Sequence, residues 1–236
     1  MPLDTDSLRA LLSRRFDTLY ATDDRGRLLH SNEWDSRPAP RFHLMRTPAG
    51  PLFRCRADMP DALVARLGEL CRDEMLGEVP QQPPARQQAY LDLLGHQAPV
   101  TQIWSGPVYR ADAALPPPRS LVAIHEGNAE LLRPLFPDWL PDVPHRRPFL
   151  AVVEGDRAVA LCASVRISDA VHCVGVETHA DYRRLGHAAA VVAGWAQAVR
   201  VLGAVPFYST SWDNQASRAV AARLGLPLVA TDFHVS

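Results

Sequence analysis

The sequence has little cysteine, and the pattern of the few it has excludes a disulfide scaffold. Four cysteines occur in 236 residues, at positions 55, 71, 162 and 173, and none forms a CxxC pair. Widely spaced cysteines in apolar or helical surroundings predict reduced thiols, most of them buried as small hydrophobic residues. No metal site is expected either, because no cysteine or histidine cluster has the spacing of metal ligands.

The sequence also lacks long apolar runs and an excess of charge of either sign. No apolar run approaches the roughly 20 residues of a membrane span, and the start, MPLDTDSLRALL, lacks the basic and apolar regions of a secretory leader. Lys plus Arg number 25 against 26 Asp plus Glu, so no net field attracts nucleic acid or anionic lipid. We therefore expect a cytoplasmic protein whose partners include neither nucleic acid nor a membrane.

What is present is a globular composition with unusually many prolines. Hydrophobic residues make up 47% of the chain, which has 21 prolines in all, and prolines cluster at positions 80–84, 116–118 and 137–148. The segment AALPPP at 113–118 is the best candidate boundary. It predicts an N-terminal α+β domain of unknown role over residues 1–112 and a second α/β domain over 119–236.

The N-terminal part has apolar residues at helical spacing and short strands, without a catalytic signature. We expect a helix from about Leu8 to Leu19, a helix beginning at Pro60, and strands over 27–30, 41–45 and 52–55.

The C-terminal part predicts a strand, a helix capped by Asn128, and then three strands joined by two-residue turns, Gly155-Asp156 and Ser168-Asp169. The remaining expected elements are a helix from Gly186 to Leu202, a strand from Pro206 and a last helix that ends before Gly225. The strands on either side of the long helix must run parallel if they share a sheet. The full set of expected ranges is 121–124, 128–135, 149–154, 157–167, 171–178, 186–202, 206–210, 216–224 and 226–231.

The segment VETHADYRRLGHA carries the chemistry, with Arg183, Gly186 and Ala188 spaced as RxxGxA. A strand end, a short loop and a helix start expose several backbone N–H groups in one direction, and the helix dipole adds positive charge. Gly186 lets the backbone approach an anion without a Cβ. The pattern therefore predicts a phosphate or pyrophosphate site.

At this point residues 119–236 resemble the GNAT (GCN5-related N-acetyltransferase) superfamily, whose pyrophosphate loop reads Q/RxxGxG/A. The resemblance extends to a second motif, YSTSWDNQASRAVAARLGL, which is similar to the family's asparagine-containing helix with a KLGF-like end. It implies a mixed, mostly antiparallel sheet with splayed parallel strands flanked by helices. It also implies that acetyl-CoA donates an acetyl group to an amine that attacks the thioester directly.

Carried over residue by residue, the resemblance implies a cofactor site on the strand, the loop and the last helix. Backbone groups of Val176, Glu177 and Thr178 would meet the pantetheine arm, and Asn214 and Ser217 would approach the cofactor from the last helix. The pyrophosphate would lie on Arg183, Arg184, Leu185, Gly186, His187 and Ala188. The acceptor is expected to be a primary amine of a small molecule or a protein, and a homodimer is compatible with the sequence.

Three residues are catalytic candidates. Many family members have a tyrosine at the position of Ala221, so we expect the general acid elsewhere, with Tyr208 the nearest phenol. Glu177 is the preferred base. If Gly175 marks a β-bulge, Glu177 and His172 would point to one face and flank the acceptor amine. Surface placement is the default for the histidines beside the loop, including His187.

Other interpretations remain open. Ala221 is compatible with a non-catalytic acyl-CoA-binding or regulatory module, and the N-terminal part with a protein-interaction domain. The triplet His145-Arg146-Arg147 would attract an anionic acceptor or would be an ordinary solvated loop.

Overall fold

The computed structural model describes residues 4–111 and 120–236, which divide into two compact units. The first unit contains the chain up to Tyr109 together with residues 209–214 and 228–236, and the second contains residues 110–208 and 215–227. The predicted boundary at 113–118 lies outside the described residues. Because two C-terminal segments belong to the first unit, the units differ from the ranges 1–112 and 119–236, whose separate roles stay a prediction.

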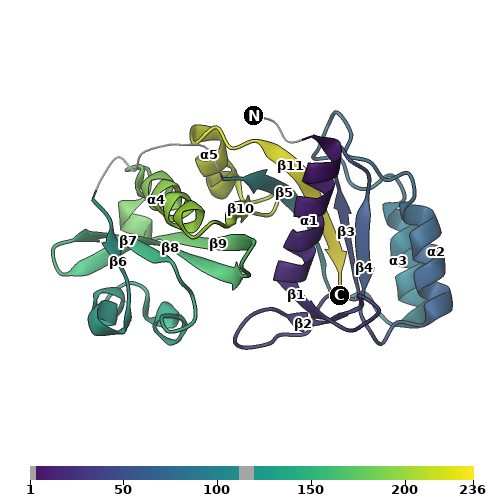
Figure 1. Cartoon of the computed structure of the whole chain (residues 1–236), viewed down its shortest axis with the longest axis horizontal. Coiled ribbons are helices and arrows are strands. Elements are labelled where there is room, and N and C mark those ends of the chain that lie inside the picture. Colours follow the sequence, from purple (N-terminus) through teal and green to yellow (C-terminus); the bar gives the residue numbers. More distant parts are fainter. Residues whose placement is uncertain (1–3, 112–119) are drawn as a thin grey trace. The chain divides into compact units, whose positions relative to one another are not determined.

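The first unit is built on an antiparallel sheet in the order β4–β3–β11–β5, accompanied by helices and a small β1–β2 hairpin (Figure 1). Its first helix begins where the Asp4 carboxylate accepts hydrogen bonds from the amides of Asp6 and Ser7. The elements are α1 Thr5–Leu19, β1 Tyr20–Thr22, β2 Leu28–Ser31, β3 Phe42–Arg46, β4 Leu52–Cys55, α2 Asp61–Cys71, α3 Gln87–Gln97, β5 Ile103–Arg110 and β11 Leu228–Val235.

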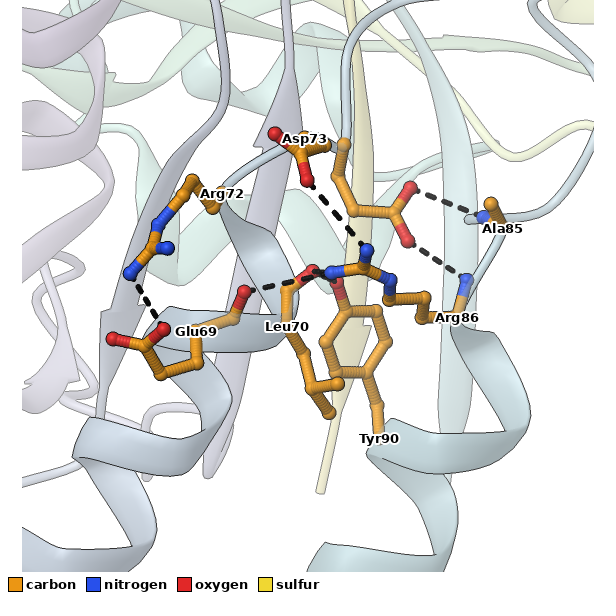
Figure 2. A network of polar contacts seen from close by, with 8 residues as sticks. Glu69, Leu70, Arg72, Asp73, Ala85, Arg86 and Tyr90 are labelled. Carbon is orange, nitrogen blue, oxygen red and sulfur yellow. Dashed lines mark hydrogen bonds and ion pairs between the residues drawn. The ribbon is translucent and has the colours of Figure 1, made fainter.

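A polar network joins the end of α2 to the start of α3 in the first unit (Figure 2). The buried carboxylate of Glu74 accepts hydrogen bonds from the amides of Ala85 and Arg86, which fixes the chain that leads into α3. Arg86 and the Tyr90 hydroxyl both donate to the carbonyl oxygen of Leu70 near the end of α2. These contacts hold the two helices together above an apolar core that includes Leu67, Tyr90 and Leu94.

The second unit contains the five strands β10–β9–β8–β7–β6, of which only β10 and β9 pair in parallel among the described residues. Its strand-to-strand turns are those the sequence predicts. The elements are β6 Val122–Ala123, η1 Glu126–Leu132, η2 Pro137–Asp142, β7 Phe149–Glu154, β8 Arg157–Ile167, β9 Val171–Thr178, η3 Ala180–Tyr182, α4 His187–Val201, β10 Val205–Ser209 and α5 Gln215–Arg223.

Different helices pack on the two faces of the β7–β9 sheet. The α4 helix packs on one face, and the 3₁₀ helices η1 and η2 pack on the other around Phe149, Leu161 and Ala163 (Figure 1). The pairing of β8 with β9 shifts between Ser164 and Arg166, so β8 carries one extra residue there and β9 runs without interruption. The alternation of side chains along β9 is therefore regular through Gly175.

Most of the C-terminal expectations are confirmed. The strands 149–154, 157–167 and 171–178 have the predicted bounds, the strands around α4 run parallel, and Gly225 ends α5 with a positive φ of 61°. The fold class, a mixed and mostly antiparallel sheet flanked by helices, is confirmed. All four cysteines are free and buried, as predicted.

Some expectations are wrong. Asn128 is not the N-cap of its helix, because η1 begins at Glu126 and His125 is the N-cap. Asn128 is the third residue of η1, and its side-chain oxygen accepts a hydrogen bond from the amide of His125. The helix α3 and the strand β5 were not predicted. Within the described residues, no helix combines the length and apolar character that crossing a membrane requires.

Candidate functional site

The parallel strands β9 and β10 separate after three residue pairs. Pairing runs from Val205 opposite Val171 to Phe207 opposite Cys173 and then stops, although β9 continues to Thr178. In the described part of the chain, residues 174–178 of β9 have strand partners only on the β8 side. Their other edge has no neighbouring strand there, and apart from the carbonyl oxygen of Thr178, which accepts from Arg183, it can offer backbone N–H and C=O groups to an extended ligand.

The loop after β9 has the backbone geometry of an anion site. Arg184 and Gly186 both adopt left-handed conformations, with φ of 65° and 82°, and α4 begins directly afterwards at His187. Alternating conformations of this kind turn successive N–H groups toward one concavity. Among the described residues, none accepts a hydrogen bond from the amides of Arg184, Leu185, Gly186 or Ala188. The amides are thus oriented for a phosphate group at the positive end of the helix dipole.

Arg223, which the sequence motifs do not predict as a site residue, also lies at this loop. A Cβ built on Gly186 would come within 3.3 Å of an Nη atom of Arg223, the last residue of α5. Arg183 donates from Nε to the carbonyl oxygen of Thr178 at 3.3 Å, so it folds back over the end of β9. Two guanidinium groups therefore flank the loop, and Gly186 leaves the space that the guanidinium of Arg223 fills. The helix-end position of Arg223 in the second motif was the only signal for it.

His187 is buried, so the expected surface placement is wrong. It is 1% exposed, and its Nε2 lies 3.5 Å from the Glu154 carboxylate at the end of β7. The first residue of α4 therefore turns its side chain into the unit, and only its backbone can face a ligand at the loop.

Glu177 lies on the exposed end of β9, and its carboxylate is held by an indole. Trp139 of η2 donates from Nε1 to the Glu177 Oε2 at 2.7 Å. The Trp139 ring packs edge-on against Phe149, at 5.7 Å between ring centroids, and lies under the Arg146 guanidinium at 5.2 Å. Arg146 and Arg147 are themselves paired with Asp142 and Glu126, so the predicted basic triplet is neutralised locally.

His172 does not share a face with Glu177, which corrects the expected pair. Its Nδ1 lies 2.8 Å from the Ser164 hydroxyl, which also accepts a hydrogen bond from the Trp195 indole of α4. The bulge that would align the two side chains lies in β8 and not at Gly175, so five residues of regular strand place them on opposite faces. Burial lowers the pKa of His172. The structure thus places His172 in a polar cluster beneath α4.

Tyr208 is 1% exposed and bonds to the backbone carbonyl oxygen of Ser217 at 3.2 Å and to the Ser217 hydroxyl. These contacts connect β10 to α5. The side chains of Tyr208 and Ser217, both predicted as site residues, are thus hydrogen-bonded to each other in this structure. Ala221 lies one turn further along α5 and is fully buried. Asn214 is exposed at the start of α5, and Val176 is half-buried on β9 beside the divergence.

Comparison with known proteins agrees with this geometry. Residues 150–231 match the family model described as GNAT acetyltransferase. A search of curated proteins finds no match.

Solved structures with a similar arrangement have low sequence identity. A Drosophila protein is 13% identical, with 100% of this chain and 97% of that chain covered and a TM-score of 0.51, a likeness of fold. A GNAT-family acetyltransferase from Colwellia psychrerythraea is 12% identical over 100% and 98% of the two chains, with a TM-score of 0.49. A GNAT-family protein from Novosphingobium aromaticivorans is 19% identical over 58% of this chain, with a TM-score of 0.45. The match spans less than two thirds of the Novosphingobium protein, 65% of its length.

Proposed function

We propose that this chain, whose residues 150–231 belong to the GNAT acetyltransferase family, is an N-acetyltransferase that moves an acetyl group from acetyl-CoA to a primary amine of a small molecule or a protein. The observation that carries the proposal is the early end of β9–β10 pairing directly before a loop whose amides find no acceptor among the described residues. One feature fits an extended arm and the other fits a diphosphate, in the order in which they occur in coenzyme A.

In the proposed complex, the backbone edge of Val176, Glu177 and Thr178 holds the pantetheine arm by hydrogen bonds of the strand type. The amides from Arg184 to Ala188 hold the pyrophosphate, and Arg183, Arg223 and the α4 dipole neutralise its charge. Acetyl-CoA, when bound, supplies an activated thioester carbonyl.

Glu177 is the proposed general base. Its carboxylate is exposed on the strand that would carry the arm, so it can accept the proton of an approaching ammonium group. The neutral amine would then attack the carbonyl carbon and the carbon–sulfur bond would break, and the proton that the nitrogen loses on becoming an amide would pass through water to the departing thiolate. Because Ala221 offers no hydroxyl and Tyr208 is bonded to Ser217, water is the proposed proton donor to the thiolate.

The cofactor site is tested by thermal unfolding with acetyl-CoA. A ligand that binds only the folded state at 100 times its Kd adds about 2.7 kcal/mol of stability, so the melting temperature should rise. Gly186→Val should abolish that rise, because a Cβ there meets Arg223 and the φ of 82° disfavours other residues.

The matched control is Gly203→Val. Gly203 has nearly the same φ, 84°, but open space around its missing Cβ and a position after the far end of α4. It should lose a similar amount of stability and keep the response to acetyl-CoA. A normal response in Gly186→Val would show that the cofactor site lies elsewhere.

A non-catalytic acyl-CoA-binding module is the second candidate, because the position of the usual tyrosine is a fully buried alanine. Release of CoA thiol over a panel of primary amines separates the two. Glu177→Gln should retain the thermal response and lose turnover by a factor of about 10² to 10⁴, as expected for a general base. Acetyl-CoA binding without turnover on any amine would favour the module.

A further inference from the structure

The contact between Trp139 and Glu177 joins two segments that nothing in the sequence pattern connects. Trp139 belongs to η2, 38 residues before Glu177 on β9. The bond uses only Oε2 of Glu177, and among the described residues no partner is found for Oε1. One carboxylate oxygen is thus held, and no partner is found for the other in the described part of the chain.

Gly175 makes this contact geometrically accessible. A Cβ at Gly175 would lie 2.9 Å from Cη2 of Trp139 and 2.6 Å from a methyl group of Val165. The indole therefore lies directly on the β9 backbone, two residues from Glu177 and on the same face. Gly175 does not form a bulge; it provides the space in which the ring sits.

The ring is fixed from its other sides as well. Phe149 of β7 packs against it with an interplanar angle of 65°, and the Arg146 guanidinium covers its face. Arg146 is in turn held by the Asp142 carboxylate at 3.0 Å. An indole packed in this way presents its N–H in one direction, so the hydrogen bond restricts the rotamers of an otherwise exposed glutamate.

We infer that Trp139 is a positioning residue, which holds the Glu177 carboxylate so that its second oxygen points at the acceptor amine. The inference rests on the proposed function, because it assigns the direction of the proposed base.

The first test observes the hydrogen bond without any acceptor. In protein labelled with ¹⁵N-tryptophan, Trp139→Phe should remove one indole resonance, and Glu177→Gln should shift that same resonance most among the five tryptophans. The control Trp34→Phe, an exposed residue of the first unit, should remove a different resonance that Glu177→Gln leaves in place. An unchanged Trp139 resonance in Glu177→Gln would overturn the inference.

The second test is a double-mutant cycle on CoA thiol release from acetyl-CoA, with the amine panel and with water alone as acceptor. Trp139→Phe should lower turnover by roughly tenfold to a hundredfold and leave the thermal response to acetyl-CoA intact. In the Glu177→Gln background it should cause no further loss, because it acts through that carboxylate. Additive losses, or full activity of Trp139→Phe, would contradict the inference.

Gly175→Ala provides a second variant in case Trp139→Phe folds poorly. Its methyl group displaces the ring and leaves the indole present, so the Trp139 resonance should shift and turnover should fall together. If no amine reacts in the wild type, the proposed function fails, while the resonance measurement still decides whether Trp139 holds Glu177.

Discussion

Arginine side chains determine the charge of the loop that precedes α4. The guanidinium of Arg223 lies beside Gly186, at the positive end of a helix dipole. A cation is not stabilised at this end of a helix unless an anion binds there as well. We expect Arg223→Gln to weaken binding of CoA and acetyl-CoA by roughly fivefold to twentyfold, with a smaller dependence on salt. Isothermal titration at two salt concentrations measures both effects.

The control for Arg223→Gln is Arg200→Gln, an exposed arginine in the last turn of α4. It removes the same charge from the opposite end of that helix and should leave the affinity unchanged. Equal losses in the two variants would mean that only the net charge of the protein matters.

Single residues differed in how far their environment could be predicted. Gly186 was predictable, because a loop before a helix with RxxGxA spacing imposes a local backbone geometry. Trp139 was not, since its role depends on a contact with β9 across 38 residues, and its sequence neighbours are prolines and loop residues. His187 was misjudged for a related reason: whether the first residue of a helix turns inward depends on what lies behind it.

At the scale of elements, β5 is the strand that we expect to be most destabilised by replacing its glycine, Gly106. Segment 210–212 runs along one edge of β5, with the amides of Thr210 and Trp212 donating to Pro107 and Ser105. A Cβ on Gly106 would lie 1.8 Å from the carbonyl oxygen of Thr210. We expect Gly106→Ala to destabilise the protein by about 3 kcal/mol or more, measured by urea unfolding.

Gly95→Ala is the matched control for the strand variant. Gly95 lies in α3 with no atom near its missing Cβ, so alanine there should be neutral or stabilise by up to about 1 kcal/mol. A loss in Gly106→Ala no larger than that control would contradict the close approach of segment 210–212.

Strong local sequence signals account for the elements that could be predicted. The elements that could not be predicted have weak local signals. The β7–β9 meander follows from two-residue turns between apolar runs, and its bounds were exact. The strand β5 was missed because Gly106 and Pro107 in its middle suggest a turn. The strand β11 extends to Val235 because polar Asp232 and His234 find buried partners, which periodicity does not reveal.

At the scale of the whole molecule, a buried charged cluster makes stability depend on pH. Asp232 of β11 is 3% exposed and pairs with Arg15 at 2.7 Å and with His43 at 3.1 Å. Burial raises the pKa of Asp232, but the charges of Arg15 and His43 outweigh it and hold that pKa well below its usual range. Its contribution is complete above a pH of about 4 and is lost as the pH falls through the folded-state pKa.

His234 adds a dependence in the milder acidic range. It stacks on Trp104 at 4.9 Å, and burial lowers its pKa to about 3. Between a pH of about 6.5 and that value the unfolded chain binds a proton that the folded chain does not, so stability must fall on acidification. The loss approaches about 1.4 kcal/mol per pH unit. Urea unfolding of the wild type between pH 7 and 4.5 should show this slope.

His234→Phe keeps a ring on Trp104 and removes the titrating group, so its unfolding free energy should change less with pH over that interval. His172 and the Asp232 cluster are present in both proteins, so both curves contain their contributions. Measurements at a pH of about 8 give the baseline, where almost all of His234 is neutral in the folded and the unfolded chain alike. If the unfolding free energy of His234→Phe falls as steeply with pH as that of the wild type, other groups cause the acid sensitivity. Removing the proton that the unfolded chain binds at this position would then have had no effect.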